Sequence, residues 1–346
     1  MGFAAAGAGV IIPASGIPMK RILVITNNLQ QASFRLRIAA LIGPLAQRGL
    51  ALDVQVRPRR LLARRRLLRS AAGYAAVILQ RKLLDPWDIR LLRRHAGKLF
   101  LDVDDAVMFD HPHAGIIARW RMRRRFRATA RQVDGIVAGN EYLGEYFRRE
   151  GPSDAQVTIV PTVVDPSRYV VKTHGATPTP TLVWIGSNST LEYLQGCFPA
   201  LAEAARLLPG LRLLTIAGDP PRDPPVPLEH VRWTADVEAA ALARGDIGIA
   251  PTPADRWTLG KCGFKIVQYM AAGLPVIASP VGANAQIVLP GETGLLPPTS
   301  GDWPAAIAAL AVDAALRARL GAAARRRVEQ HYSLATAVDA WAKLLA

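Results

Sequence analysis

Short apolar runs alternate with helical stretches along this chain, and that alternation limits the fold more than any other feature. In the first part of the sequence these runs occupy residues 20–26, 52–57, 74–81, 98–105, 133–140 and 156–165. Their length and their content of Ile, Val and Leu are typical of strands that are buried on both faces of a sheet. Strands that alternate with helices form βαβ units, so the sequence predicts an α/β fold with parallel sheets.

The pattern begins again after "THGATPTPT" at 173–181, a stretch rich in Pro and Thr that we interpret as a linker. Further strands are expected at 181–187, 211–218, 246–253 and 274–279. A length of 346 residues suits two domains. We therefore predict two doubly wound, Rossmann-like domains whose parallel sheets face a central cleft. Ligands of such domains bind beyond the carboxyl ends of the strands.

The predicted segments are a flexible N-terminal extension at 1–18, an N-terminal domain at 19–172, the linker at 173–181, a C-terminal domain at 182–330 and a C-terminal helix at 331–346. We expect this last helix to cross back to the N-terminal domain. The extension is apolar, but Lys20 and Arg21 follow its apolar run, whereas a secretory signal carries its positive charges first. Pro, Gly or charged residues break every long apolar run, so no membrane-spanning segment is expected.

Positive charge is concentrated in the first half of the chain. Residues 1–177 hold 29 Lys and Arg against 13 Asp and Glu, whereas residues 178–346 hold 14 of each, and the net charge is +16. The basic segments 57–69 and 119–127 indicate an anionic partner such as acidic lipid, nucleic acid or a phosphorylated substrate. The alternative is that they are solvated helix faces. Because the basic runs contain few aromatic residues for base stacking, we expect no nucleic-acid partner.

The cysteine and histidine spacings argue against a disulfide scaffold and against a metal site. Only Cys197 and Cys262 are present, far apart in the sequence, which suits a reducing compartment. The histidines show no spacing that is typical of metal ligands. We therefore expect a protein of the cytoplasm or of the inner face of a membrane, with no obligatory metal or cofactor.

Polar residues follow the expected strand ends of the C-terminal domain. The strand at 181–187 runs into Gly186, Ser187, Asn188, Ser189 and Thr190, and a helix follows. Hydroxyls and backbone N–H groups at such a position can bind an anion, although ordinary N-capping is the alternative interpretation.

The loop after the strand at 246–253 supplies Trp257 and Lys261 and leads into a helix that begins near Lys265. Lys265 and Gln268 are three residues apart and so share a helical face. A lysine and an amide near the positive end of a helix suit a diphosphate and its attached ribose. The loop after the next strand offers Asn284 to the same ligand.

These stretches together resemble a known family. "FKIVQYMAAGLPVIASPVGAN…GETGLL", preceded by "IVPTVVD", "WIGSNSTLEYL" and "GDIGIAP", is similar to the carboxyl-terminal signature of family-4 retaining glycosyltransferases of the GT-B fold. The resemblance implies a nucleotide-diphosphate sugar donor bound mainly by the second domain and a lipid-linked or saccharide acceptor bound by the first. It also implies transfer with retention of configuration and without an obligatory metal, in synthesis of cell-surface polysaccharide or glycoconjugate.

The sequence departs from the family's pattern at the donor site. The usual pair of glutamates, spaced eight apart, falls at Gly260 and Gln268. The Arg and Lys that commonly follow the first glycine loop are also missing, because "GSNSTLEYL" is uncharged until Glu192. Lys261 and Lys265 are therefore the expected cations for the leaving diphosphate.

Candidate acceptor and catalytic residues lie in the first domain. Ser33 and Arg35 follow the first strand and are assigned to the acceptor; Arg35 is favoured over Arg37, which is expected to face solvent. Asp104, Asp105 and His111 follow the strand at 98–105 and are the catalytic candidates, because carboxylates at a buried strand end cost energy unless they face a functional opening. A helix cap at Asp105 is the alternative, and Asn140 is expected to cap a helix.

Two other functions stay open at this stage. A GT-B-like shell without catalysis could bind an anionic membrane or nucleic-acid surface, which the charge and the missing glutamates favour. A nucleotide-sugar 2-epimerase of the same fold is the second alternative, and it has no need of a basic acceptor domain.

Overall fold

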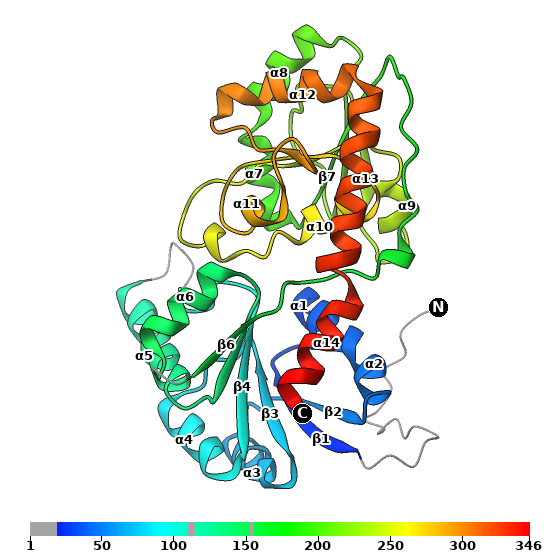
Figure 1. Ribbon diagram of the computed structural model, residues 1–346. Coiled ribbons are helices and arrows are strands. Elements are labelled where there is room, and N and C mark those ends of the chain that lie inside the picture. The colour runs from blue at the N-terminus through cyan, green and yellow to red at the C-terminus, as the bar shows by residue number, and fades with distance from the viewer. Residues whose placement is uncertain (1–18, 110–114, 153–154) are drawn as a thin grey trace. The chain divides into compact units, whose positions relative to one another are not determined.

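The computed structural model describes residues 19–109, 115–152 and 155–346, and these form two compact units (Figure 1). The first unit holds the chain up to Thr162 together with Gly260–Cys262 and Leu334–Ala346. The second unit holds Val163–Leu259 and Gly263–Ser333. The first division, after Thr162, precedes the expected linker at 173–181, and the domain boundaries from the sequence stay a prediction.

The first unit is built on a six-stranded parallel sheet in the order β2-β1-β3-β4-β5-β6. Its strands are β1 (Lys20–Thr26), β2 (Leu50–Val56), β3 (Ala76–Gln80), β4 (Lys98–Val103), β5 (Gly135–Ala138) and β6 (Gln156–Ile159). All six lie where the apolar runs predict them. The runs at 98–105 and 156–165 continue past the ends of the strands because their last residues form loops at the carboxyl edge.

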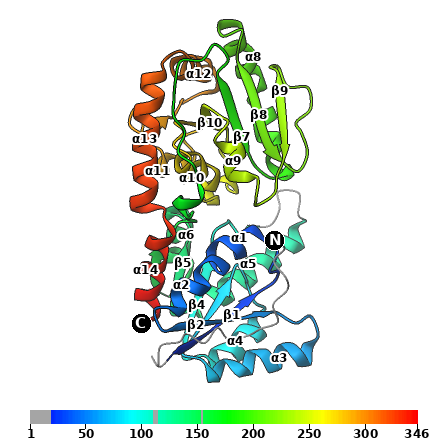
Figure 2. The ribbon, with the colours of Figure 1, turned by 90° about the vertical axis from the view of Figure 1, so that its right-hand side faces the viewer.

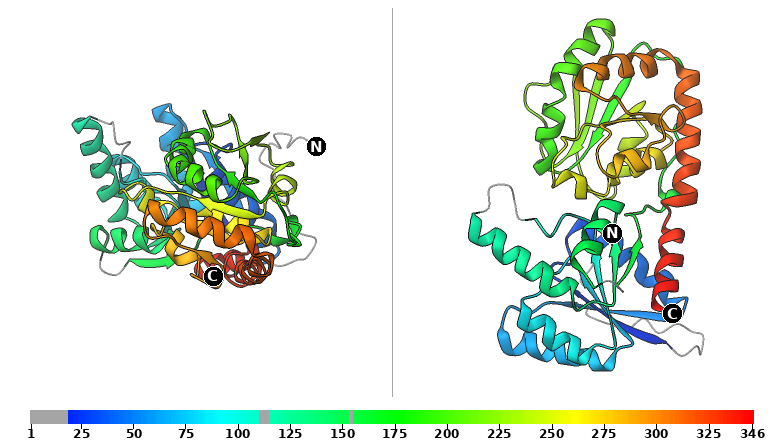
Figure 3. Two further views of the ribbon diagram at one scale, coloured as in Figure 1. Left: turned by 90° about the horizontal axis from the view of Figure 1, so that it is seen from above. Right: turned by 60° about the vertical axis from the view of Figure 1, so that its left-hand side comes forward.

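Helices cover both faces of this sheet. The helices are α1 (Ala32–Arg37), α2 (Ile42–Ala46), α3 (Leu61–Ser70), α4 (Pro86–His95), α5 (Ile116–Ala130), α6 (Glu141–Glu150) and α14 (Leu334–Leu345). The helices α3, α4, α5 and α6 pack in sequence as one layer, which the right-hand view of Figure 3 shows in cyan to green. This layer follows from right-handed crossovers between strands that progress in one direction across the sheet.

The last helix, α14, packs in the first unit against α2 and the neighbouring 3-10 turn at Ala39–Leu41. It buries Val338, Trp341 and Leu345 on one side. At its exposed side an ion pair joins Arg48 Nη2 to Asp339 Oδ1 at 2.6 Å. The final residues of the chain therefore contribute to the core of the first unit.

The second unit has its own parallel sheet in the order β12-β11-β10-β7-β8-β9. Figure 2 labels β7, β8, β9 and β10 of this sheet. The strands are β7 (Thr181–Ile185), β8 (Arg212–Ala217), β9 (Leu228–Arg232), β10 (Ile247–Ala250), β11 (Val276–Ala278) and β12 (Gly294–Leu295). The helices are α7 (Leu191–Gln195), α8 (Phe198–Leu207), α9 (Glu238–Leu242), α10 (Phe264–Ala271), α11 (Asn284–Ile287), α12 (Trp303–Val312) and α13 (Ala314–His331). One apolar cluster packs α10 and α13 on the sheet, and another packs α8 and α12.

A buried tyrosine fixes α10 to the sheet of the second unit. The hydroxyl of Tyr269 accepts a hydrogen bond from Ile185 N at 2.9 Å and donates one to Ile249 O at 3.1 Å. Its ring lies against Gly248, where an added Cβ would come within 2.4 Å of the ring. The ladder between β7 and β10 is short, so the phenol satisfies backbone groups at the point where these strands separate.

Across the described part of the chain, no helix has both the length and the apolar composition needed to cross a bilayer.

Candidate active site

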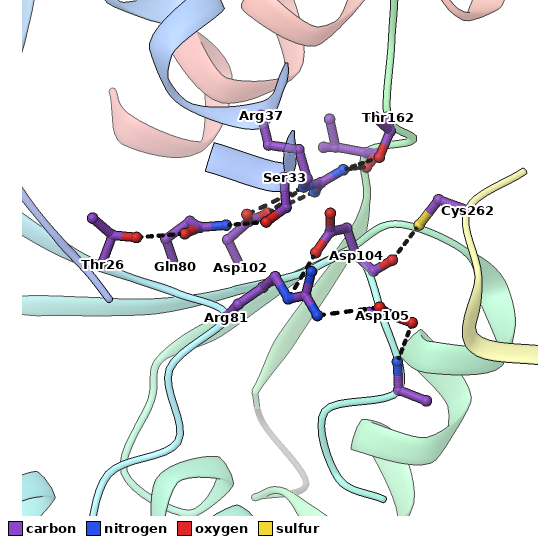
Figure 4. Close-up of polar contacts among 12 residues, drawn as sticks. Thr26, Ser33, Arg37, Gln80, Arg81, Asp102, Asp104, Asp105, Thr162 and Cys262 are labelled. Atoms are coloured by element: carbon purple, nitrogen blue, oxygen red, sulfur yellow. Dashed lines mark hydrogen bonds and ion pairs between the residues drawn. The ribbon is translucent and has the colours of Figure 1, made fainter. Parts of the chain in front are cut away.

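Polar side chains of the first unit meet at the carboxyl edge of β1, β3 and β4 (Figure 4). Thr26 ends β1, and its hydroxyl donates to Gln80 Oε1 at 2.8 Å. Gln80 ends β3, and its Nε2 donates to Ser33 Oγ at 3.4 Å. Ser33 is buried and is held by this chain of bonds from the strand ends. The structure thus places this acceptor candidate beside the sheet edge, at the start of α1.

A buried ion pair joins α1 to β4. The Nε and Nη2 atoms of Arg37 lie 2.6 to 3.1 Å from the Asp102 carboxylate, and Nη1 donates to Val160 O at 2.8 Å. Both side chains are almost fully buried. Burial alone would lower the pKa of Arg37, but the charge and hydrogen bonds of Asp102 raise it above the usual value. Arg37 therefore keeps its charge and compensates that of Asp102.

The expectation that Arg37 faces solvent is wrong. Arg37 is 3 % exposed, because its guanidinium is held inside the fold by the buried carboxylate of Asp102. Arg35 lies on the same short helix and is partly exposed. The structure leaves Arg35 as the candidate of the two for contact with a ligand, and that role stays a prediction.

Asp104 and Asp105 lie just beyond β4 and share Arg81 as their partner (Figure 4). Arg81 Nε is 3.4 Å from Asp104 Oδ1, and Nη2 is 3.1 Å from Asp105 Oδ2. Arg81 itself has a φ of 50°, a left-handed conformation that residues with a side chain adopt at a cost, often near functional sites. Asp105 Oδ1 accepts from Ala106 N at 3.2 Å, so the alternative that it caps a helix does not hold among the described residues.

The Asp104 carboxyl group has an unusual proton affinity. Burial raises its pKa from 3.8 to about 6, and the nearby charges of Asp102 and Asp105 add to the rise, against the opposing effect of Arg81 and Arg37. A carboxyl group with this pKa can exchange a proton near neutral pH. This is the property that a group needs in order to take part in acid–base chemistry.

The segment Gly260–Cys262 belongs to the first unit by its contacts. Cys262 Sγ donates to Asp104 O at 2.9 Å, and Asn140 Nδ2 donates to Lys261 O at 2.9 Å. Gly139 leaves room for this segment, since an added Cβ would lie 2.2 Å from Cys262 Sγ. Asn140 also accepts from Leu143 N at 2.9 Å, so its predicted role as a helix cap is confirmed.

The raised pKa of Asp104 predicts a pH dependence of stability. Between about pH 4 and pH 6 the folded protein holds a proton on Asp104 that the unfolded chain has released, so the free energy of unfolding falls as the pH rises. The shift from 3.8 to about 6 corresponds to at most about 3 kcal/mol. Urea unfolding of the wild type and of Asp104→Asn across this range measures it. If both show the same pH dependence, Asp104 ionises normally in the fold.

In the second unit, residues 187–190 form a compact turn after β7. Ser187 Oγ and Ser189 Oγ are 2.8 Å apart, and Thr190 Oγ1 donates to Ser187 O at 2.9 Å. Asn188 Oδ1 accepts from Asp219 N at 3.0 Å, and its amide donates to the Asp219 carboxylate, which ties this turn to the loop after β8. Ser187 makes no side-chain capping bond, so the N-capping alternative is wrong for this serine.

Trp184 brings the Gly186 turn and Lys265 to one place. Lys265 Nζ lies 4.4 Å from the centre of the Trp184 ring. An added Cβ at Gly186 would come within 2.5 Å of the same indole. Trp184 is fully buried, so it fixes the position of both neighbours at the carboxyl edge of β7. The ammonium of Lys265 and the backbone of the turn are thus close enough to serve one anionic ligand.

Gln268 is buried on α10 and is already hydrogen-bonded. Its side chain bonds to the hydroxyl of Tyr169, which donates to Glu238 Oε1 at 3.0 Å, and Trp233 Nε1 donates to Glu238 Oε2 at 2.8 Å. Burial, together with Glu238, raises the pKa of Tyr169 far above its usual value. The sequence did not predict this network, because its members come from three separate segments.

Asn284 and Trp257 stabilise loops at the same edge of the second sheet. Asn284 Nδ2 lies 3.2 Å from Thr252 Oγ1 and 3.2 Å from Ser279 O, which joins the loops after β10 and β11. The backbone N of Trp257 donates to Asp255 Oδ1 at 2.7 Å within a tight turn. Both residues lie in loops that follow the carboxyl ends of strands, where ligands of such sheets bind. Their direct contact with a ligand stays a prediction.

The catalytic candidate His111 lies outside the described residues. Within 19–109, 115–152 and 155–346, no group of three or more His, Cys, Asp or Glu is arranged to hold a metal ion.

Comparison with known proteins connects the strand-end site of the second unit with a family. Residues 179–314 match the family described as Glycosyl transferases group 1. This segment contains the Gly186 turn, Lys265, Gln268 and Asn284. Glycogen synthase of Mycobacterium tuberculosis is 27 % identical over 237 residues, which cover 62 % of this chain and 54 % of that protein. The chain thus spans about half the length of the curated relatives it matches.

The fold as a whole has counterparts among solved structures. Sucrose-phosphate synthase from Thermosynechococcus elongatus superposes with a TM-score of 0.73 at 17 % identity, covering 94 % of this chain and 98 % of that chain. HepE of Anabaena, in complex with UDP and glucose, gives a TM-score of 0.70 at 15 % identity, covering 94 % and 99 %. A glycosyltransferase from Rickettsia africae gives 0.68 at 14 %, covering 94 % and 98 %. The predicted GT-B fold class with two parallel sheets is confirmed.

The segment that matches Glycosyl transferases group 1 belongs to the second unit except for Gly260–Cys262, whose contacts place it in the first unit. The predicted resemblance to glycosyltransferases is confirmed, and the narrower assignment to family-4 retaining enzymes stays a prediction. Lys261 and Lys265 both lie within the matched segment, but Lys265 belongs to the second unit and Lys261 to the first.

Proposed function

We propose that this protein is a glycosyltransferase that moves a sugar from a nucleotide-diphosphate sugar to an acceptor hydroxyl. The observation that carries the proposal is the convergence of Lys265 and the Gly186 turn on Trp184 at the strand ends of the second unit. These residues lie in the segment that matches group 1 glycosyltransferases. The structure of HepE with UDP and glucose supports a nucleotide sugar as the donor class.

In the proposed reaction the acceptor oxygen forms a bond to the anomeric carbon while the bond from that carbon to the diphosphate oxygen breaks. Lys265 neutralises the negative charge that develops on the leaving diphosphate. The same role is proposed for Lys261 on the sequence pattern alone. The proton of the acceptor hydroxyl passes to an oxygen of the leaving phosphate, so no separate general base is needed. We propose that transfer retains the anomeric configuration and needs no metal.

We assign acceptor binding to the carboxyl edge of the first unit. Ser33 and Arg35 are proposed to contact the acceptor, and the Asp104 carboxyl group is proposed to hydrogen-bond to it without taking the proton that moves in the transfer. The acceptor is a saccharide or lipid-linked saccharide, and the protein acts in the cytoplasm or on the inner face of a membrane in cell-surface polysaccharide synthesis. Support for an anionic, lipid-linked acceptor comes from the excess of basic residues in the first part of the chain.

Thermal-shift measurements with UDP, GDP, dTDP and their sugars test the donor site. We expect at least one nucleoside diphosphate to raise the melting temperature, because a ligand that binds only the folded state stabilises it by mass action. The nucleoside monophosphates are the matched control, since they lack the second phosphate. If none of the diphosphates shifts the melting temperature, the enzyme proposal fails and the non-catalytic alternative is favoured.

The epimerase alternative is separated from transfer by its product. An epimerase converts one nucleotide sugar into another with no net release of nucleoside diphosphate. A transferase releases the nucleoside diphosphate as a product. Proton NMR of the reaction mixture follows the sugar and its anomeric configuration, which also tests retention.

Activity that persists in the presence of EDTA tests the proposed independence from metal.

A further inference from the structure

An aromatic and basic pocket lies between α4 and α5 of the first unit. Its volume is about 400 Å³. The residues that matter most for its chemistry are Trp87, Trp120, Arg90, Arg123, Arg124 and Arg131. Among the described residues that line the pocket, none is acidic. None of the residues that line this pocket is assigned to the donor or the acceptor of the proposed transfer reaction.

Both tryptophans expose most of their surface. Trp87 is 76 % exposed and Trp120 is 59 % exposed, which is unusual for the largest apolar side chain. Each stacks with an arginine: Arg90 lies 5.9 Å from the Trp87 ring, and Arg124 lies 5.5 Å from the Trp120 ring. These contacts orient the indoles without burying them. An exposed, oriented indole is typical of a surface that is covered when a partner binds.

The positive charge at the pocket is dense enough to affect a neighbouring carboxylate. Arg90, Arg123, Arg124 and Arg131 are all exposed. Glu150 lies near two of them, and its pKa is lowered chiefly by a hydrogen bond from Arg127, with further contributions from Arg123 and Arg131. One glutamate thus stands among at least three arginines, so the surface keeps a net positive charge.

Exposed aliphatic side chains extend the same helical layer. Ile116 and Ile117 at the start of α5 are 85 % and 68 % exposed, and Leu62 on α3 is 80 % exposed. The helices α3, α4 and α5 pack side by side (Figures 1 and 3). Aliphatic chains do not stack on nucleic-acid bases, but they insert between lipid tails. This mixture of Arg, Trp and aliphatic residues suits an interfacial surface.

We propose that this surface, the Trp–Arg face (Trp87, Arg90, Ile116, Ile117, Trp120, Arg123, Arg124 and Arg131), docks on a bilayer that contains anionic phospholipid. The indoles lie at the level of the headgroups, and the guanidinium groups bind lipid phosphates bidentately. This inference deepens the proposed function, because it names the surface that brings the protein to a lipid-linked acceptor. It makes no use of the donor site, so the two can fail separately.

Vesicle sedimentation tests the inference. We expect the full-length protein to bind vesicles made of equal parts phosphatidylglycerol and phosphatidylcholine, and to bind vesicles of phosphatidylcholine alone far more weakly. Binding should weaken strongly in about 1 M NaCl, where the Debye length is about 3 Å. Brominated lipid should quench tryptophan fluorescence, and this quenching should fall in a Trp87→Phe, Trp120→Ala variant.

A matched pair of charge variants locates the binding. The test variant carries Arg90→Gln, Arg123→Gln, Arg124→Gln and Arg131→Gln. The control carries Arg206→Gln, Arg222→Gln, Arg232→Gln and Arg326→Gln, which remove the same charge from exposed positions of the second unit. Each arginine near an anionic leaflet contributes close to a fivefold gain in affinity. We therefore expect at least about a hundredfold loss for the test variant and little loss for the control.

Three outcomes would overturn the inference: equal vesicle binding by the test and control variants, no preference for anionic lipid in the wild type, or binding of a single-stranded oligonucleotide that is tighter than the binding of anionic vesicles and is lost in the test variant. The last would reassign the face to nucleic acid. Both variants should keep the thermal shift given by a nucleoside diphosphate. If the wild type binds vesicles but no nucleotide, the Trp–Arg face stands and the glycosyltransferase proposal fails.

Discussion

Substituting Lys265→Met should weaken the binding of the stabilising nucleoside diphosphate about 10- to 100-fold, the loss typical of one charge-assisted hydrogen bond. The Lys265 ammonium is held 4.4 Å from the centre of the Trp184 ring beside the Gly186 turn, so it is positioned before a ligand arrives. In the reaction the loss should be larger, about 10²- to 10³-fold in kcat/KM, because charge on the leaving diphosphate grows in the transition state. Isothermal titration calorimetry and donor-turnover assays measure the two effects.

Methionine is chosen at position 265 because its unbranched thioether keeps the contact with the indole and removes only the charge. Lys343→Met, at an exposed position on α14, is the matched control and should leave nucleotide binding unchanged. Nucleoside monophosphate binding should change less than diphosphate binding in the Lys265 variant. Unchanged diphosphate affinity in Lys265→Met would show that this lysine is not part of a phosphate site.

Breaking the buried ion pair between Arg37 and Asp102 should cost about 3–5 kcal/mol of unfolding free energy. In Asp102→Ala the Arg37 guanidinium keeps its bond to Val160 O but loses the carboxylate that compensates its charge in a nearly dry environment. Urea denaturation followed by circular dichroism measures the change. The loss should appear in the transition that reports on the first unit.

The exposed ion pair between Arg48 and Asp339 provides the matched control for this prediction. Its N–O distance is 2.6 Å, the same as that of the buried pair, yet both side chains are more than half exposed. Arg48→Ala should therefore cost at most about 1 kcal/mol. The double substitution Arg37→Met, Asp102→Leu should recover part of the loss, because it removes both charges together. A loss as large in Arg48→Ala would mean that burial is not what makes the first pair important.

The positions of the strands were largely predictable from sequence, because buried parallel strands are short apolar runs whatever their surroundings. The run at 20–26 coincides with β1. The helix cap at Asn140 was predicted correctly because a cap depends only on residues next to it in the sequence. The strand β12 was not predicted, since two residues carry too little pattern to be distinguished from a loop.

The candidate sites were predictable only in outline. The sequence locates Asp104 and Asp105 at a strand end, but their partner Arg81 comes from another strand end and adopts a left-handed backbone that no local pattern indicates. Arg37 was misassigned to solvent because its partner is 65 residues away. A signal was present, since Gln80 and Asp102 are polar residues at the ends of apolar runs, and buried polar groups require partners.

The contact between Tyr269 and Gly248 has a consequence for natural variation in relatives of this protein. The Tyr269 phenol bonds to the backbone of β7 and β10, and its ring fills the space above a residue that has no side chain. A larger residue at position 248 would displace the ring and, with it, the helix that carries Lys265. The two positions should therefore covary, and changes of donor preference in such lineages should accumulate in the loops that follow β7 and β10 rather than along α10.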